Sequence, residues 1–168
     1  MSSELTVLND LIYENEAIRQ YIRSLKNAMD EEEALLLQKG DKLTAHQSRT
    51  LGRSQYHLQQ SLLNLREVLT RHYLHEEKVL PQMVGPLLVE AFKSALKGII
   101  EELDRDEALL HDDLRQLRNT ELLARSYNVR RAIDGVSKVI EEHITKEDTV
   151  LELLKGALNI QKATNETA

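Results

Sequence analysis

Two histidine–glutamate pairs with identical spacing are the residues of this sequence best suited to chemistry. His72 lies four positions before Glu76, and His143 lies four positions before Glu147. In an α-helix, residues four apart lie on one face, so each pair would present an imidazole and a carboxylate in the same direction. Imidazoles and carboxylates are ligands for iron, manganese or zinc, and carboxylates can bridge two such ions. The two pairs therefore predict a metal site, with two ions as the simplest arrangement.

Three more residues are candidates for the same site. Glu107 and His111 have the same spacing on a third segment, and either or both could coordinate. Asn15 lies on a first segment, in line with its apolar residues. The predicted set of metal ligands is His72, Glu76, Glu107, His111, His143, Glu147 and Asn15.

Long helices must carry these residues, because helix-forming residues dominate and helix breakers are rare. The 168 residues include only two prolines and six glycines, which leaves too few turns for a β-sandwich or a β-barrel. Apolar residues recur at the three-four spacing of helices that bury one face. Short connections make neighbouring helices antiparallel. We expect an all-α, up-down-up-down four-helix bundle with helices at residues 4–37, from between 43 and 54 to 81, 87–118 and 121–159.

A chain of this length can bury one sizeable core, so we expect a single domain. We predict that residues 1–160 form the bundle. The last residues are small and polar, and we predict a flexible C-terminal tail at residues 161–168.

The candidate ligands interrupt the apolar stripes near the middle of each helix, where their burial is costly. A buried carboxylate without a partner costs several kcal/mol or takes up a proton, and neighbouring carboxylates repel one another. Bound cations remove both problems. An interior network of histidine–glutamate hydrogen bonds is the alternative. Two matched pairs together with a third carboxylate favour the metal site.

Composition excludes several other classes of function. Without cysteine there are no disulfides, thiol nucleophiles, iron–sulfur ligands or cysteine-based zinc sites, so nitrogen and oxygen must hold any metal. The net charge of −6 argues against nucleic acid or an anionic membrane as partner. The longest uncharged apolar run, residues 79–89, is too short to span a bilayer, and the acidic N-terminus is unlike a signal peptide. We expect a cytoplasmic protein, for which a homodimer is one open arrangement.

The segments that carry the two pairs resemble the signatures of hemerythrin-like (HHE cation-binding) domains. The stretch HYLHEEKVLP at residues 72–81 is similar to the second-helix signature, and HITKEDTVL at residues 143–151 to the fourth-helix signature. The resemblance covers essentially the whole chain, and it implies an antiparallel four-helix bundle around a non-haem iron pair. It also implies that His72 and His143 are terminal ligands and that Glu76 and Glu147 are bridging carboxylates.

Two departures from the family pattern affect the expected chemistry. Asn15 and Glu107 stand where the family usually has histidine. An amide is a poor substitute for the imidazole of the family pattern, so the ion nearest Asn15 would be weakly held or missing, and one ion instead of two stays open. The resulting set is rich in carboxylates, which favour ferric iron or manganese and lower the redox potential. Three hypotheses follow. The first is a hemerythrin-type iron protein that binds or senses dioxygen or nitric oxide, or handles iron. The second is a carboxylate-rich di-metal oxidase or peroxidase-like enzyme that acts on dioxygen or peroxide. The third is a degenerate, metal-free helical interaction module, which Asn15 supports best.

Overall fold

Four helices make up the fold of the described residues. The computed structural model describes residues 2–37, 45–108 and 119–167, and it leaves out some side chains within the helices, that of Glu107 among them. Helix α1 spans Ser2–Leu37, α2 Ala45–Val79, α3 Pro86–Ala108 and α4 Asn119–Thr167. A short 3₁₀ turn, η1, occupies Leu80–Gln82. No strand occurs within these ranges, which agrees with the predicted all-α class.

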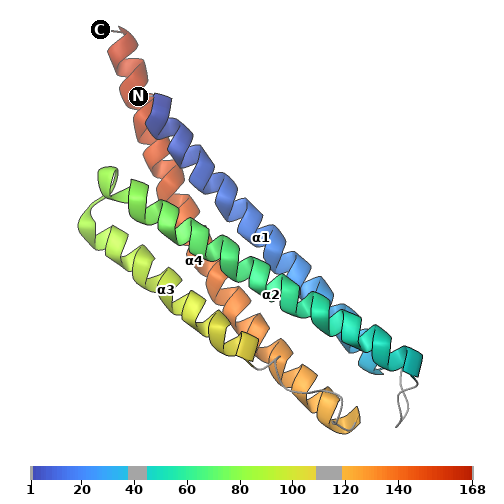
Figure 1. Cartoon of the computed structure of the whole chain (residues 1–168). Helices are drawn as coiled ribbons and strands as arrows, with labels where there is room; N and C mark the ends of the chain where they lie inside the picture. Colours follow the sequence, from blue (N-terminus) through green and yellow to red (C-terminus); the bar gives the residue numbers. More distant parts are fainter. Residues whose placement is uncertain (1, 38–44, 109–118, 168) are drawn as a thin grey trace.

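The helices run alternately up and down, as Figure 1 shows. Helix α1 contacts α2 and α4, and α3 contacts the same two helices. Along α1, Arg19 pairs with Asp148 of α4, and Asp30 pairs with Arg130. A later residue of α1 thus meets an earlier residue of α4, so the two helices are antiparallel. The predicted up-down-up-down bundle is confirmed.

Proline shapes the short connection between α2 and α3. Pro81 lies in η1, and the backbone N–H groups of Met83 and Val84 both donate to the carbonyl of Leu80, at 2.9 and 3.0 Å. Pro86 begins α3, at a position where its missing N–H costs nothing. The turn therefore reverses the chain within a few residues.

This short turn sets the register of α3 along α2. Glu77 pairs with Lys93 at 3.0 Å, and Arg66 pairs with Asp104 at 2.6 Å. Each step back along α2 is thus matched by a step forward along α3. The backbone of Glu107 lies one helical turn beyond Asp104. It is therefore farther from the α2–α3 turn than the Arg66–Asp104 pair is.

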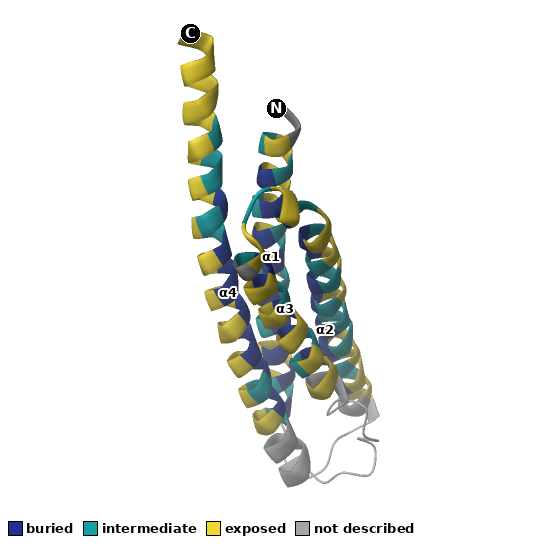
Figure 2. Ribbon diagram, turned by 90° about the vertical axis from the view of Figure 1, so that its left-hand side faces the viewer, coloured by how far each residue is buried: buried dark blue, intermediate teal, exposed yellow. Residues whose placement is uncertain are grey.

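Some helix ends differ from those expected. Helix α4 continues to Thr167 instead of ending near residue 159, because neither proline nor glycine follows Gly156. Residues 159–167 are exposed, as the yellow end of α4 in Figure 2 shows. The division into a bundle at 1–160 and a flexible tail stays a prediction. Helix α3 ends its described part at Ala108, and the remainder of the helix expected at 87–118 lies outside the described residues. None of the described helices has a stretch long and apolar enough to cross a membrane.

Two apolar clusters fill the bundle, and buried polar residues lie between them. The larger cluster includes Ile18, Leu69 and Ile140. The smaller one, near the α2–α3 turn, includes Leu11 and Leu151. Figure 2 shows the buried stripe along the inner faces of the helices. We call the five buried polar residues between the two clusters the polar layer: Asn15, His72, Glu76, His143 and Glu147.

Candidate metal centre

Helices α2 and α4 each bring one histidine and one glutamate into the polar layer. His72, Glu76 and Glu147 are at most 1% exposed, and His143 is 8% exposed. One ligand atom from each of His72, Glu76 and Glu147 lies within 4.8 Å of the corresponding atoms of the other two. The structure therefore brings together the two pairs that the sequence singles out.

Glu147 lies between the two imidazoles and turns one oxygen towards each. Its Oε1 is 2.7 Å from Nε2 of His72, and its Oε2 is 3.0 Å from Nε2 of His143. Glu76 lies beside the first imidazole, with Oε1 2.9 Å from Nε2 of His72. Each carboxylate oxygen of Glu147 faces a different histidine. A carboxylate in this position can bridge two ions.

Several atoms of the polar layer are buried and have no hydrogen-bond partner. They are both carboxylate oxygens of Glu76, Oε2 of Glu147, Nε2 of His143 and Oδ1 of Asn15. The close approaches within the His143–Glu147 and His72–Glu76 pairs thus lack hydrogen-bond geometry. Each buried polar atom left unpaired costs about 1–3 kcal/mol. A cation among these atoms would offset that cost, and a donor set of imidazole nitrogen and carboxylate oxygen fits iron, manganese or zinc.

Glu14 of α1 holds the opposite side of the His72 ring. Nδ1 of His72 lies 2.6 Å from Glu14 Oε2, and Nδ1 of His75 lies 2.6 Å from Glu14 Oε1. An imidazole that donates its Nδ1–H to a carboxylate presents Nε2 to a metal and keeps its orientation. Glu14 was not predicted from the sequence, because it lies beside the core stripe of α1 and not on it. Its place directly before the buried Asn15 is the signal that could have found it.

The charges of the polar layer are strongly coupled. Burial opposes the charged form of His72, but hydrogen bonds to Glu14 and Glu147 and the nearby carboxylate of Glu76 raise its pKa to about 12. Burial raises the pKa of Glu76 to about 8, with Glu147 adding to the rise and His72 opposing it. Burial also opposes the charged form of Glu147, yet His143 and His72 hold its pKa well below the usual range. Without a metal, the layer therefore holds a cationic His72 next to an anionic Glu147.

Asn15 takes part in the layer through a chain of polar contacts to α4. Its Nδ2 donates to Oδ1 of Asp148 at 2.8 Å, and Arg19 donates to the other oxygen of Asp148 at 2.6 Å. Burial alone would lower the pKa of Arg19, but the bond to Asp148 raises it above the ordinary value. Asp148 therefore joins Asn15 and the charged guanidinium of Arg19, with one oxygen bonded to each.

Helix α3 meets the centre with an aromatic ring. Phe92 stands edge-on to His143, with ring centroids 5.6 Å apart. The backbone of Glu107 lies about 22 Å farther along α3 at the ordinary helical rise. Its side chain and the whole of His111 lie outside the described residues, so their roles as ligands stay predictions.

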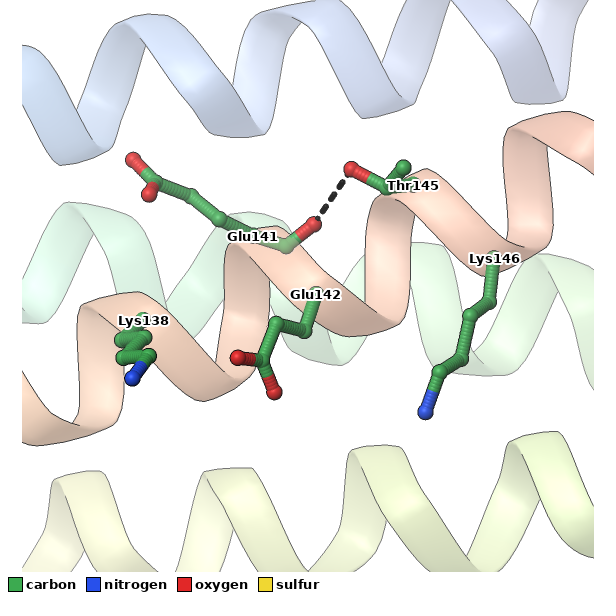
Figure 3. Close-up of a pocket in the computed structure, with 5 residues that line it drawn as sticks. All are labelled: Lys138, Glu141, Glu142, Thr145 and Lys146. Carbon is green, nitrogen blue, oxygen red and sulfur yellow. Dashed lines mark hydrogen bonds between the residues drawn. The ribbon is translucent and has the colours of Figure 1, made fainter.

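The outer face of α4 differs chemically from the face that carries His143 and Glu147. A surface hollow of about 360 Å³ lies there. Figure 3 shows the side chains that line it, those of Lys138, Glu141, Glu142, Thr145 and Lys146. The hydroxyl of Thr145 donates to the backbone carbonyl of Glu141 at 2.8 Å. This face carries exposed charges of both signs, whereas His143 and Glu147 are buried.

A four-helix bundle with a buried layer of histidine and glutamate defines a class of metal-binding helical proteins. The family described as Hemerythrin HHE cation binding domain matches residues 6–154. This match covers most of the chain, so the chain belongs to that family, and the resemblance noted in the sequence is confirmed. No curated protein and no solved structure matches the chain. Family membership and the buried His72–Glu76–Glu147 cluster together support metal-ion binding.

Proposed function

We propose that this protein is a non-haem iron protein of the hemerythrin type, which holds its metal in the polar layer. The observation that carries the proposal is the set of unpartnered atoms of Glu76, Glu147 and His143. They gather around Nε2 of His72 and around the Glu147 carboxylate. Iron, manganese and zinc suit such a mixture of nitrogen and oxygen donors. The hemerythrin family match supports iron as the first choice, with manganese as the nearest competitor.

The placement of Glu147 supports two ions held side by side. His72, Glu76 and Oε1 of Glu147 would hold one ion, and His143 with Oε2 of Glu147 would hold the other. His72 would keep its Nδ1–H bond to Glu14 and give up the proton on Nε2. The apolar clusters on both sides of the layer keep water away from these side chains.

Iron held by these residues would supply one-electron redox chemistry and an affinity for small ligands such as dioxygen, nitric oxide or peroxide. We propose binding or sensing of such a ligand, or the handling of iron, as the role of the protein, in the cytoplasm. The family match and the dry surroundings of the layer support this role.

Metal analysis of protein purified without chelator and loaded anaerobically with ferrous iron tests the proposal. The wild type should hold one or two iron ions per chain, and His72→Ala and His143→Ala should each lose iron. His57→Ala is the matched control, because His57 is an exposed histidine on α2. A wild type that retains no stoichiometric transition metal refutes the proposal and leaves a metal-free interaction module. Equal iron loss in the control would remove the polar layer as the site.

A carboxylate-rich oxidase or peroxidase-like enzyme is the second candidate. The observation that favours it is that Glu14, Glu76 and Glu147 all lie within 3 Å of the nitrogens of one imidazole, that of His72. Stopped-flow mixing of the ferrous protein with dioxygen or peroxide separates the two candidates. A binding protein gives a reversible adduct or a single change of redox state, whereas an enzyme consumes oxidant over many turnovers.

A further inference from the structure

The amide of Asn15 has only one orientation that its surroundings permit. Asp148 is a carboxylate and can only accept hydrogen bonds, and it lies 2.8 Å from the amide nitrogen of Asn15. Arg19 donates to the second oxygen of Asp148 at 2.6 Å and keeps that side chain in place. The NH₂ group of Asn15 must therefore face Asp148.

The carbonyl oxygen of Asn15 consequently faces away from Asp148. Asn15 is 0% exposed, and its Oδ1 is buried without a hydrogen-bond partner. The residue lies on the core stripe of α1 between Leu11 of one apolar cluster and Ile18 of the other, in the same layer as the candidate ligands. Its neighbour Glu14 bonds to His72, and its partner Asp148 follows Glu147 in α4. An unsatisfied oxygen at this position has a use only if something electropositive binds near it.

We propose that Arg19 and Asp148 are positioning residues that hold the carbonyl oxygen of Asn15 towards the bound metal, as a neutral oxygen donor. The inference rests on the proposed function, since it needs a metal in the polar layer. Asn15 adds a hard oxygen donor without adding charge, so it favours manganese over zinc. Replacing it by histidine should shift the preference of the site towards zinc.

Substitution of Asp148 by asparagine should reverse the amide. The new side chain would turn its carbonyl oxygen to Arg19 and its NH₂ group to Asn15. The carbonyl oxygen of Asn15 would then have to accept from this NH₂ group, and it would turn away from the proposed metal. Loss of such an outer partner costs about 10–100-fold in metal affinity. Asp148→Asn should therefore weaken Mn²⁺ binding about tenfold or more, and Asn15→Leu should do the same.

A double-mutant cycle separates positioning from a general structural effect. If Asp148 acts through Asn15, Asp148→Asn should have no further effect on Mn²⁺ affinity in an Asn15→Leu background. Asp30→Asn is the matched control, since Asp30 also joins α1 to α4 by a 2.6 Å contact with an arginine, Arg130. It lies away from the polar layer and should change the affinity less than twofold. Titration with Mn²⁺, followed by the electron paramagnetic resonance signal of the free ion, measures the four proteins of the cycle and the control.

The orientation itself has a readout that needs no metal. In the metal-free protein, the side-chain NH₂ resonances of Asn15 should exchange slowly with solvent, and Asp148→Asn should shift them. Fast exchange in the wild type overturns the orientation. Undiminished Mn²⁺ affinity in Asp148→Asn, or a full additional loss in the double variant, overturns the positioning role while the proposed function stands. A wild type with protected Asn15 resonances that binds no metal overturns the proposed function and this role together.

Discussion

Metal binding in the polar layer should release protons, and Glu76 should set how many. Without metal, burial raises the pKa of Glu76 to about 8. Despite its burial, His72 has a pKa of about 12 because Glu14, Glu147 and Glu76 surround it. Both side chains therefore carry a proton near neutral pH. A metal that uses Nε2 of His72 and the carboxylate of Glu76 must displace both protons, so its affinity should rise with pH.

The slope of this rise follows from the two pKa values. Each displaced proton contributes a factor of ten in affinity per pH unit, or about 1.4 kcal/mol. Below pH 8, metal binding displaces both protons, so metal affinity should rise about 100-fold per pH unit. Above pH 8 only the His72 proton remains, and the contribution falls to about tenfold. Glu76→Gln has no carboxyl proton to displace at this position. Below pH 8, its metal affinity should therefore rise only about tenfold per pH unit, against about 100-fold in the wild type. Above pH 8, the two proteins should show the same rise.

Competition between the protein and a chromophoric chelator for Mn²⁺, from pH 6.5 to 9, measures both slopes. His57→Ala should follow the wild type throughout, because His57 lies on the exposed face of α2. Identical slopes for the wild type and Glu76→Gln below pH 8 would show that Glu76 is not a protonated ligand. An affinity that falls with rising pH would refute metal binding through His72 altogether.

Three more outcomes follow from the same contacts. Glu14→Gln should lower metal affinity about 10–100-fold without loss of helicity, because a neutral amide holds the two imidazoles less well; chelator competition and circular dichroism check this, and unchanged affinity would exclude the role. The metal-free protein should lose thermal stability from pH 6 to 9. The folded-state pKa values of Glu76 and His72 lie above the ordinary 4.5 and 6.5, so their stabilisation is complete below those values and declines as the pH rises towards about 8 and about 12. Calorimetry measures the decline, and Glu76→Gln should flatten it between pH 6 and 8; a melting temperature that rises over this range would contradict the assignment. Leu65→Ala, in the centre of the larger apolar cluster, should cost about 2–5 kcal/mol in denaturant unfolding yet leave the metal stoichiometry unchanged; changed stoichiometry would mean that the layer depends on distant packing.

The part of the site on α2 and α4 could be predicted because its signal is local. His72, Glu76, His143 and Glu147 each take a position in a helical stripe that is otherwise apolar, and the spacing within one helix places each pair on one face. Burial follows from the stripe alone. The structure needs no unusual backbone at these positions: among the described residues there is no cis peptide and no residue with positive φ.

The apolar stripe of α3 could not show in the same way which residue of this helix lies beside the polar layer. A stripe indicates which face of a helix is buried, but not which of its residues comes level with a residue of another helix. That level depends on the length of the connection, and the short turn after α2 brings Phe92 level with His143. The Glu77–Lys93 and Arg66–Asp104 pairs continue this register. Counting outwards from the turn would have predicted it, because a tight hairpin pairs residues nearly symmetrically about its centre.

Helix α1 contributes no histidine to the polar layer, but its side chains contact those of the neighbouring helices. Glu14 reaches across to the His72 ring of α2, and Arg19 reaches across to Asp148 of α4. Asn15 lies between them with its oxygen turned inwards. Helix α1 thus orients side chains of α2 and α4, whereas in the proposed site α2 and α4 would supply the charged donors. The two groups of residues should therefore respond differently to substitution. Changes on α1 should alter affinity and metal preference at constant stoichiometry, and loss of His72 or His143 should remove metal, because only the second change takes away a charged or imidazole donor.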